Sequence, residues 1–184
     1  MTPPLLRPAT RDDEPFLWAM LYEASHAAEQ GLTSPDALRA IPDLSRYVDG
    51  WGDRDDLGVV GGTATEPEGA AWIRLFTSEN PGYGYVEDTI PELAIAVAPA
   101  ARGTGLGTAL LTRLIAEARS RYPAISLSVR AENPARRLYT RIGFIDVADS
   151  EIINRAGTTS VTMLLWFRRQ GEYQMSHTSS RTRV

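Results

Sequence analysis

The 184-residue chain is 43% hydrophobic and 23% charged, proportions that suit a globular domain with a buried core. It contains no cysteine, which excludes disulfides, thiolate metal sites and a cysteine nucleophile. All 19 basic residues are arginine, which excludes a Schiff-base or P-loop lysine, and the net charge of −4 argues against a nucleic-acid binder.

Two further classes are not expected. The histidines are His26 and His177 alone, so no metal site is predicted. No apolar run reaches membrane-spanning length, and residues 1–4 lack the pattern of a signal peptide. We therefore expect a cytoplasmic protein that binds neither membranes nor nucleic acid.

The first elements are a short strand at 5–9 and a helix capped by Thr10. Acidic residues fill the first turn of that helix, where the helix dipole favours them, and Gly31 is its expected end. The broken apolar pattern of residues 32–51 predicts one or two short helices over a pocket.

A β-hairpin follows. Its strands are expected at 57–65 and 70–76, with the turn at 66–69. Residues 80–88, which are both acidic and aromatic, are expected to form a loop.

The next strand is expected at 92–98, and a glycine-rich turn at 102–107 leads into a helix over about 105–121. Alternating apolar and polar residues then predict a strand at 125–130.

In the last part of the chain, Asn133 and Pro134 predict a helix start by the cap-plus-proline rule, and Gly143 predicts its end. The last strands are expected at 144–147 and 161–167, connected through a turn at 154–157.

This order combines antiparallel hairpins with two β-α-β crossovers, which predicts an α/β fold with a mixed sheet and helices on both faces. We expect one domain over residues 1–167, followed by a disordered tail at 168–184 because that segment is polar and lacks periodicity.

The glycine-rich turn predicts an anion site, because a strand, a glycine turn and a helix start in series direct free N–H groups at one point. It is not a Walker P-loop, which needs a lysine. It also fails the dinucleotide fingerprint, because Thr108 stands where the third Gly or Ala belongs. The pattern that fits is Arg-x-x-Gly-x-Gly, starting at Arg102.

This pattern, followed about thirty residues later by the segment from Asn133 to Phe144 (NPARRLYTRIGF), resembles the GNAT superfamily of acyl-CoA-dependent N-acyltransferases. The resemblance covers residues ~5–167 in the order of elements and is most specific over 92–118 and 125–144. It implies a mixed, mostly antiparallel sheet of six to seven strands with a splayed central parallel pair. It also implies acetyl-CoA as co-substrate and no metal.

The resemblance implies a set of cofactor contacts. Backbone N–H groups of the turn would hold the pyrophosphate of coenzyme A, and the free edge of the strand at 92–98 would pair with the pantetheine arm. An amide near Val97 would polarise the thioester carbonyl. The implied cofactor-binding residues are Ile95, Ala96, Val97, Arg102, Gly103, Thr104, Gly105, Leu106, Gly107, Thr108, Asn133 and Arg136.

The resemblance also implies two catalytic side chains. Tyr139 would protonate the departing thiolate as a general acid. Glu92 would accept the proton of the attacking amine, with Glu87, Asp88 or a water molecule as alternatives, because one residue of strand slip would reverse the side that Glu92 faces.

The expected activity is transfer of an acetyl group to a primary amine of a small molecule or peptide, by direct attack in a ternary complex. The alternatives are a non-catalytic acyl-CoA sensor and a purely structural module. Similar proteins are often dimers, so a homodimer is one expectation. The segments of the acceptor side contain four aromatic residues, Tyr47, Trp51, Tyr83 and Tyr85.

Overall fold

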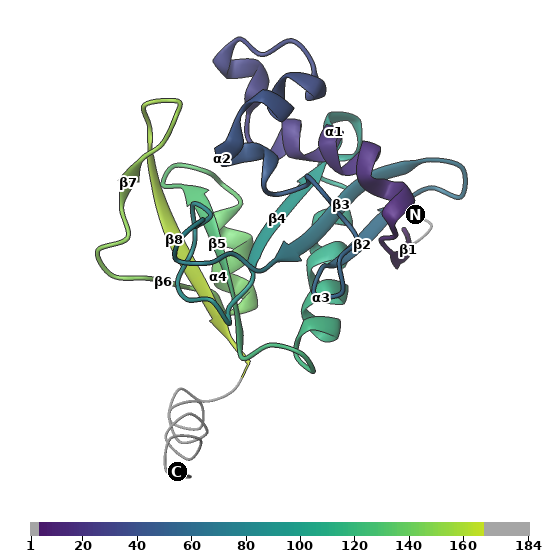
Figure 1. The fold of residues 1–184 in the computed structure, drawn as a ribbon. Helices are drawn as coiled ribbons and strands as arrows, with labels where there is room; N and C mark the ends of the chain where they lie inside the picture. The colour runs from purple at the N-terminus through teal and green to yellow at the C-terminus, as the bar shows by residue number, and fades with distance from the viewer. Residues whose placement is uncertain (1–3, 168–184) are drawn as a thin grey trace.

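The computed structural model describes residues 4–167, and the tail expected at 168–184 lies outside them. Within the described residues, eight strands form one sheet in the order β1-β2-β3-β4-β5-β8-β6, and β7 also pairs with β8 (Figure 1). The strands are β1 (Leu5–Pro8), β2 (Leu57–Gly62), β3 (Pro67–Arg74), β4 (Glu92–Val97), β5 (Ala124–Arg130), β6 (Ile145–Asp146), β7 (Ile152–Ile153) and β8 (Thr159–Trp166).

The α-helices are α1 (Glu14–Ala24), α2 (Pro42–Ser45), α3 (Leu106–Ala118) and α4 (Arg136–Ile142). Short 3-10 helices lie at Arg11–Asp13, Ala27–Gln30, Pro35–Ala40 and Pro99–Ala101. None of the helices within residues 4–167 is long and apolar enough to cross a membrane.

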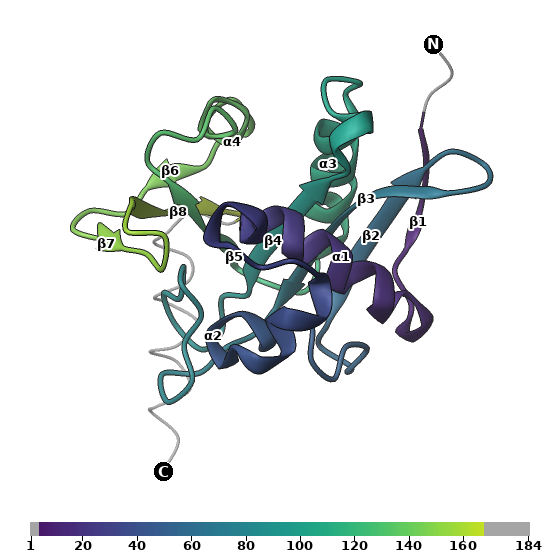
Figure 2. The same ribbon diagram turned by 90° about the horizontal axis from the view of Figure 1, so that it is seen from above.

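Helices cover both faces of the sheet, as the order of elements predicts. Figure 2 shows α1 and α2 on one face and α3 and α4 on the other. Leu110, Leu111 and Leu114 of α3 are fully buried against one face, while Leu17 and Trp18 of α1 are buried against the other. The sheet is therefore the middle layer between two separate apolar cores.

The central strands β4 and β5 are parallel, and every other pair in the sheet is antiparallel. Only Glu92 and Ser126 are register partners between them, and Figure 1 shows the two strands leaning apart beyond that point. On its other side β4 pairs with β3 in unbroken register from Glu92 to Val97, so no bulge interrupts it. The expected splayed parallel pair is present.

The start of the first helix follows its sequence signal. Thr10 and Asp13 form a capping box, in which the Thr10 N–H donates to Asp13 Oδ2 at 2.7 Å. Arg7 donates two hydrogen bonds to the same carboxylate, and this pairing lowers the pKa of Asp13. Strand β1 is thereby tied to the start of α1.

Two predicted boundaries are wrong, and one strand was not predicted. The first hairpin turns at 63–66 rather than 66–69, because the Thr63 hydroxyl accepts the N–H of Glu66 and Pro67 already begins β3 beside a register shift. The Asn133 side chain accepts the N–H of Ala135 at 2.9 Å, so α4 begins only at Arg136. The sequence analysis also missed β7, a two-residue strand on the edge of β8.

The helix predicted to end at Gly31 is also interrupted. His26 has φ 53, in the left-handed region, and this residue separates α1 from the 3-10 helix Ala27–Gln30. A left-handed conformation is rare outside glycine, and its presence marks the turn where the chain leaves α1 beside the site described next.

Candidate active site

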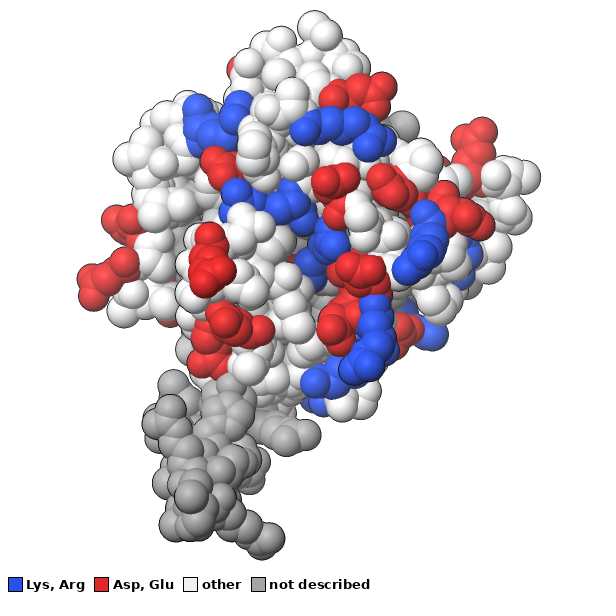
Figure 3. Space-filling model, viewed as in Figure 1, with Lys and Arg blue, Asp and Glu red and all other residues white. Residues whose placement is uncertain are grey.

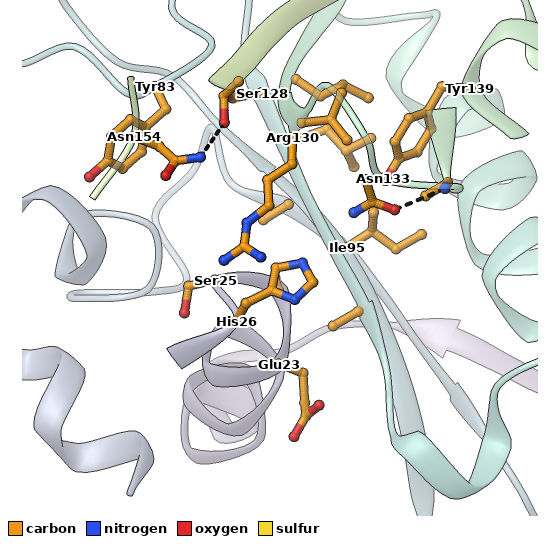
Figure 4. Close-up of a pocket in the computed structure, with 18 of the residues that line it drawn as sticks. Glu23, Ser25, His26, Tyr83, Ile95, Ser128, Arg130, Asn133, Tyr139 and Asn154 are labelled. Carbon is orange, nitrogen blue, oxygen red and sulfur yellow. Dashed lines mark hydrogen bonds between the residues drawn. The ribbon is translucent and has the colours of Figure 1, made fainter. Parts of the chain in front are cut away.

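A cleft of about 1680 Å³ opens where β4 and β5 diverge. Its walls come from the end of α1, from β4, from the glycine turn before α3, from the end of β5, from α4 and from the turn between β7 and β8 (Figure 4). Segments far apart in the sequence therefore meet at one opening in the middle of the sheet.

The glycine turn forms one end of the cleft. Gly103 and Gly105 have φ angles of 77° and 89°, a backbone conformation that side chains with a Cβ rarely adopt. Gly105 is the N-cap of α3, so the first N–H groups of this helix lie beside the cleft without intrahelical partners.

Gly107 has a different reason to be glycine. Its φ is not positive, and a Cβ there would meet only Val97 Cγ2, at an ordinary 3.6 Å. Neither strain nor crowding within the protein requires glycine here, whereas close approach of a ligand to the helix start would. The turn and its dipole thus fit an anion such as a pyrophosphate.

The structure places the predicted cofactor residues of this turn in two groups. Arg102, Gly103, Gly105, Gly107 and Thr108 line the cleft. Of the others, Leu106 is buried in the core, and the Thr104 hydroxyl donates to the carbonyl of Ala101 at 2.8 Å.

Arg102 is engaged with protein partners. Its Nη2 donates to Glu23 Oε2 at 2.8 Å, and its Nε donates to the carbonyl of Val97 at 3.2 Å. The side chain is exposed, so the ion pair is screened by solvent and contributes little to stability. Arg102 can exchange Glu23 for an anion at small cost.

The edge of β4 forms the floor of the cleft. Ile95, Ala96 and Val97 line it, and none of the three has a register partner on β5. Backbone groups on this edge are therefore available to pair with an extended ligand that has amides of its own.

Glu92 is buried at the point where β4 and β5 still touch, with 3% of its surface exposed. It lines the cleft, and its Oε1 accepts the hydroxyl of Tyr47 at 2.7 Å. Burial raises the pKa of Glu92 to about 7, although the Tyr47 hydrogen bond and the nearby N–H of Gly84 act in the opposite direction. A carboxyl group with such a pKa can accept a proton near neutral pH.

The surroundings of Glu92 hold it in place. The Tyr47 hydroxyl also accepts the N–H of Tyr83 at 2.8 Å, which connects the loop after β3 to the carboxylate. A Cβ on Gly82 would clash with Glu92 Oε2, so this glycine lets the same loop close over the acid. By contrast, Glu87 and Asp88 do not line the cleft, and Asp88 accepts the Ser78 N–H and the Tyr85 hydroxyl.

Tyr139 lines the opposite wall of the cleft, from α4. It is buried and packs edge-on against Phe144, with ring centroids 5.8 Å apart. In Figure 4 its hydroxyl points toward Asn133, into the region between the two strands. Burial raises the pKa of Tyr139 to about 12, so this hydroxyl keeps its proton at neutral pH and is a hydrogen-bond donor.

Of the other two predicted residues near α4, one lines the cleft and the other does not. Asn133 lines the cleft, with its side-chain oxygen committed to the N–H of Ala135. Arg136 does not line it. Its Nη2 pairs with both oxygens of Asp146, at 2.9 and 2.8 Å, and its Nη1 donates to the carbonyl of Ala131.

Of the four aromatic residues expected on the acceptor side, Tyr47 and Tyr83 line the cleft. The Tyr83 hydroxyl is buried and has no hydrogen-bond partner among the described residues. Trp51 is a core residue whose indole N–H donates to the carbonyl of Thr10. Tyr85 is half-buried against the same core, and its hydroxyl donates to Asp88 Oδ1.

The sequence analysis did not single out several polar residues of the cleft, among them His26, Arg130, Asn154 and Arg155. Arg130 carried a usable signal, because the alternation of β5 puts it on the same face as Ser126 and Ser128. The others come from turns, whose side-chain directions periodicity does not predict.

The surface outside the cleft does not indicate a second binding site on the face that Figure 3 shows. On the face shown in Figure 3, arginine and acidic side chains are interspersed, without one extended patch of a single charge. No group of three or more acidic or histidine side chains within residues 4–167 is arranged to hold a metal ion.

Comparison with known proteins agrees with this geometry. Residues 17–144 match the family described as Acetyltransferase (GNAT) family. No curated protein matches the sequence significantly.

Solved structures share the fold at low sequence identity. One is the ribosomal-protein-S18-alanine N-acetyltransferase of Escherichia coli, with 20% identity, a TM-score of 0.63, and coverage of 92% of this chain and 97% of that one. Another, from Salmonella typhimurium, is described as a putative acetyltransferase with its cofactor acetyl-CoA; it has 20% identity, a TM-score of 0.63, and coverage of 92% of this chain and 96% of that one. A spermidine N-acetyltransferase chimera from Vibrio cholerae and hSSAT has 20% identity, a TM-score of 0.61, and coverage of 94% of this chain and 99% of that one.

Proposed function

This chain belongs to the GNAT acetyltransferase family, and we propose that it transfers an acetyl group from acetyl-CoA to a primary amine by direct attack in a ternary complex. The observation that carries the proposal is the cleft itself. The glycine turn, the free edge of β4, a buried acid and a buried phenol lie around one opening. We also propose that residues 1–167 act as one domain.

The residues present suit coenzyme A. The start of α3, with Gly103, Gly105 and Gly107, would hold the pyrophosphate, and Arg102 would add charge after release from Glu23. The edge of β4 at Ile95 to Val97 would pair with the amides of the pantetheine arm. When bound, acetyl-CoA supplies the activated acetyl group as a thioester.

Glu92 would take the proton that the ammonium form of the acceptor must lose before it attacks, directly or through water. Its raised pKa, about 7, makes it a stronger base than an exposed carboxylate. Tyr47 would fix the direction of its lone pairs by donating to Oε1. As the C–N bond forms and the C–S bond breaks, a backbone N–H of β4 near Val97 would stabilise the charge on the carbonyl oxygen.

Tyr139 would donate to the departing sulfur. A thiol has an ordinary pKa of about 8.5, so transfer from a phenol of pKa about 12 is unfavourable if only the phenol is buried. Both groups would lie in the same buried region, and burial raises the pKa of a thiol as well. The proton of Tyr139 would therefore move to sulfur late, as the negative charge there becomes complete.

The test is release of free thiol from acetyl-CoA across a panel of amines, amino acids and peptides, with mass spectrometry of the products. The proposal predicts thiol release that depends on an amine and an amine product heavier by one acetyl group. Tight binding of coenzyme A with no amine-dependent release would instead support a non-catalytic acyl-CoA sensor. Absence of coenzyme A binding would refute both functions.

A further inference from the structure

We infer that the acceptor carries an anionic group, such as a carboxylate or phosphonate, in addition to its amine, and that Arg130 and Arg155 bind that group. The inference rests on the proposed transfer to an amine and specifies the acceptor of the same cleft. Its basis is the set of polar groups on the face of the cleft toward α1 and α2.

Two cleft residues have a buried polar atom without a hydrogen-bond partner among the described residues: the hydroxyl of Tyr83 and Nη2 of Arg130. Glu92 also lines the cleft and is buried, and the loop at Gly82 packs against its Oε2. A buried polar atom left without a partner destabilises the folded state, and such atoms are rare in folded proteins. Two of them in one cleft indicate that a polar ligand completes them. An acid, a phenol and a guanidinium together match a ligand with both a cationic and an anionic group.

Arg130 is placed to meet the anionic group. It extends from the end of β5 into the middle of the cleft, beside His26 (Figure 4). Its Nη1 donates to Glu29 Oε2 at 2.6 Å, which leaves Nη2 for a ligand. Arginine stays charged at all relevant pH values and offers several N–H donors to one anion.

Glu29 does not remove this capacity. Its carboxylate is exposed and is shared between Arg130 and His26, whose Nδ1 lies 3.1 Å from Glu29 Oε1. Water around the exposed Glu29 carboxylate screens this pair and weakens it, although the Arg130 side chain is only 21% exposed. It orients the guanidinium toward the cleft without satisfying all of its donors.

Arg155 adds a second cation. Its only hydrogen bond within residues 4–167 is to the neutral Gln30 Oε1 at 3.4 Å, and no acid in that part of the chain pairs with it. Asn154 fixes the turn that carries it, because the Asn154 side chain bonds the N–H groups of Ala156 and Thr158 and the hydroxyl of Ser160. The charge of Arg155 also acts on Tyr83, where it lowers the pKa of the phenol against the larger effect of burial.

The strand register sets the distance between the two ends. Glu92 is level with Ser126, and Arg130 lies four residues further along β5, or about 13 Å of strand. The long side chain of Arg130 spans part of that distance. The amine and the anionic group of the acceptor are therefore held at opposite ends of one small molecule.

The test compares amino carboxylates with alkylamines of the same length that lack the carboxylate. The probes run from glycine to 6-aminohexanoate, with phenylalanine against phenethylamine as an α-amino acid pair and 3-aminopropylphosphonate as the phosphonate arm. Binding to the protein saturated with coenzyme A is measured by calorimetry, and kcat/KM is measured by thiol release. The variants are Arg130→Gln and Arg155→Gln, and the control is Arg113→Gln on the exposed surface of α3.

The inference predicts that at least one charged probe binds tenfold or more tightly than its matched amine. Arg130→Gln should reduce that preference at least tenfold, whereas Arg113→Gln should leave it unchanged. Equal or better binding and turnover of the plain amines would overturn the inference and leave the proposed function intact. Binding of the charged probe that depends on Arg130, without turnover of any amine, would support this anion site and refute the acetyl transfer.

Discussion

Replacing the buried acid with its neutral isostere, Glu92→Gln, should change how the stability of the protein depends on pH. Burial raises the pKa of Glu92 from the ordinary 4.5 to about 7. Between these values the folded protein holds a proton on Glu92 that the unfolded chain has released. The contribution of Glu92 to stability is therefore largest below pH 4.5 and falls as the pH rises toward 7. Above pH 7 this contribution is lost.

The magnitude follows from the shift. A difference of 2.5 pKa units corresponds to about 3 kcal/mol of unfolding free energy at high pH, as an order of magnitude. Glutamine can still accept the Tyr47 hydroxyl through its side-chain oxygen but never ionises. The unfolding free energy of the variant, relative to that of the natural protein, should thus rise by about 2.5 kcal/mol between pH 5 and pH 8.

Urea unfolding at a series of pH values measures this difference, and subtraction of the two proteins removes the contributions of other titrating groups. Glu66→Gln, an exposed residue of the β2–β3 turn, is the matched control and should show no pH-dependent difference. A difference between Glu92→Gln and the natural protein that stays flat from pH 5 to pH 8 would refute the reasoning. It would mean that Glu92 is ionised in the folded protein at the lower pH.

Three further substitutions separate the roles assigned to the cleft. Tyr139→Phe should lower kcat by about a hundredfold, because it removes the proton donor, and should leave the coenzyme A Kd from calorimetry within about twofold; unchanged kcat with a competent acceptor would exclude Tyr139 as the acid. Tyr47→Phe removes a hydrogen bond that lowers the pKa of Glu92, so the acidic limb of the kcat/KM profile should move upward by about one pH unit; a limb that stays in place or moves down would contradict Glu92 as the titrating base. Gly107→Ala should leave thermal stability unchanged or raised, since its Cβ has room, but should weaken coenzyme A binding about tenfold by calorimetry; full affinity would mean that the pyrophosphate does not approach this part of the turn. As a contrast, Gly105→Ala should destabilise the fold by about 1 kcal/mol, because Gly105 has a positive φ.

The sequence contained enough to predict the elements of the cleft that we propose for coenzyme A. The apolar strand, the glycine turn from Arg102 to Gly107 and the following helix are local signals, because each depends on neighbours in the chain. The structure places the expected strand, turn and helix in series, and Gly103 and Gly105 do adopt positive φ angles.

The acceptor half could not be predicted in this way, because it depends on contacts between distant residues. Glu92 faces Tyr47 only because β4 runs in unbroken register beside β3, and Tyr47 lies 45 positions away in the sequence. Arg130 meets Glu29 across 101 positions, and the left-handed conformation of His26 has no signal in the chain around it. The resemblance implies a cofactor contact for Arg102, and the structure pairs this side chain with Glu23 of α1, a contact between distant residues.

The central claim is direct transfer of acetyl from acetyl-CoA to an amine within this cleft, and the initial-velocity pattern of thiol release tests it most directly. Both substrates are varied together, with an amine that the panel identifies as an acceptor. Because the chain has no cysteine and the proposed attack is direct, we expect intersecting lines in the double-reciprocal plot and an acetylated amine formed in step with the thiol. Parallel lines, or acetylated protein isolated before the amine is added, would contradict the account.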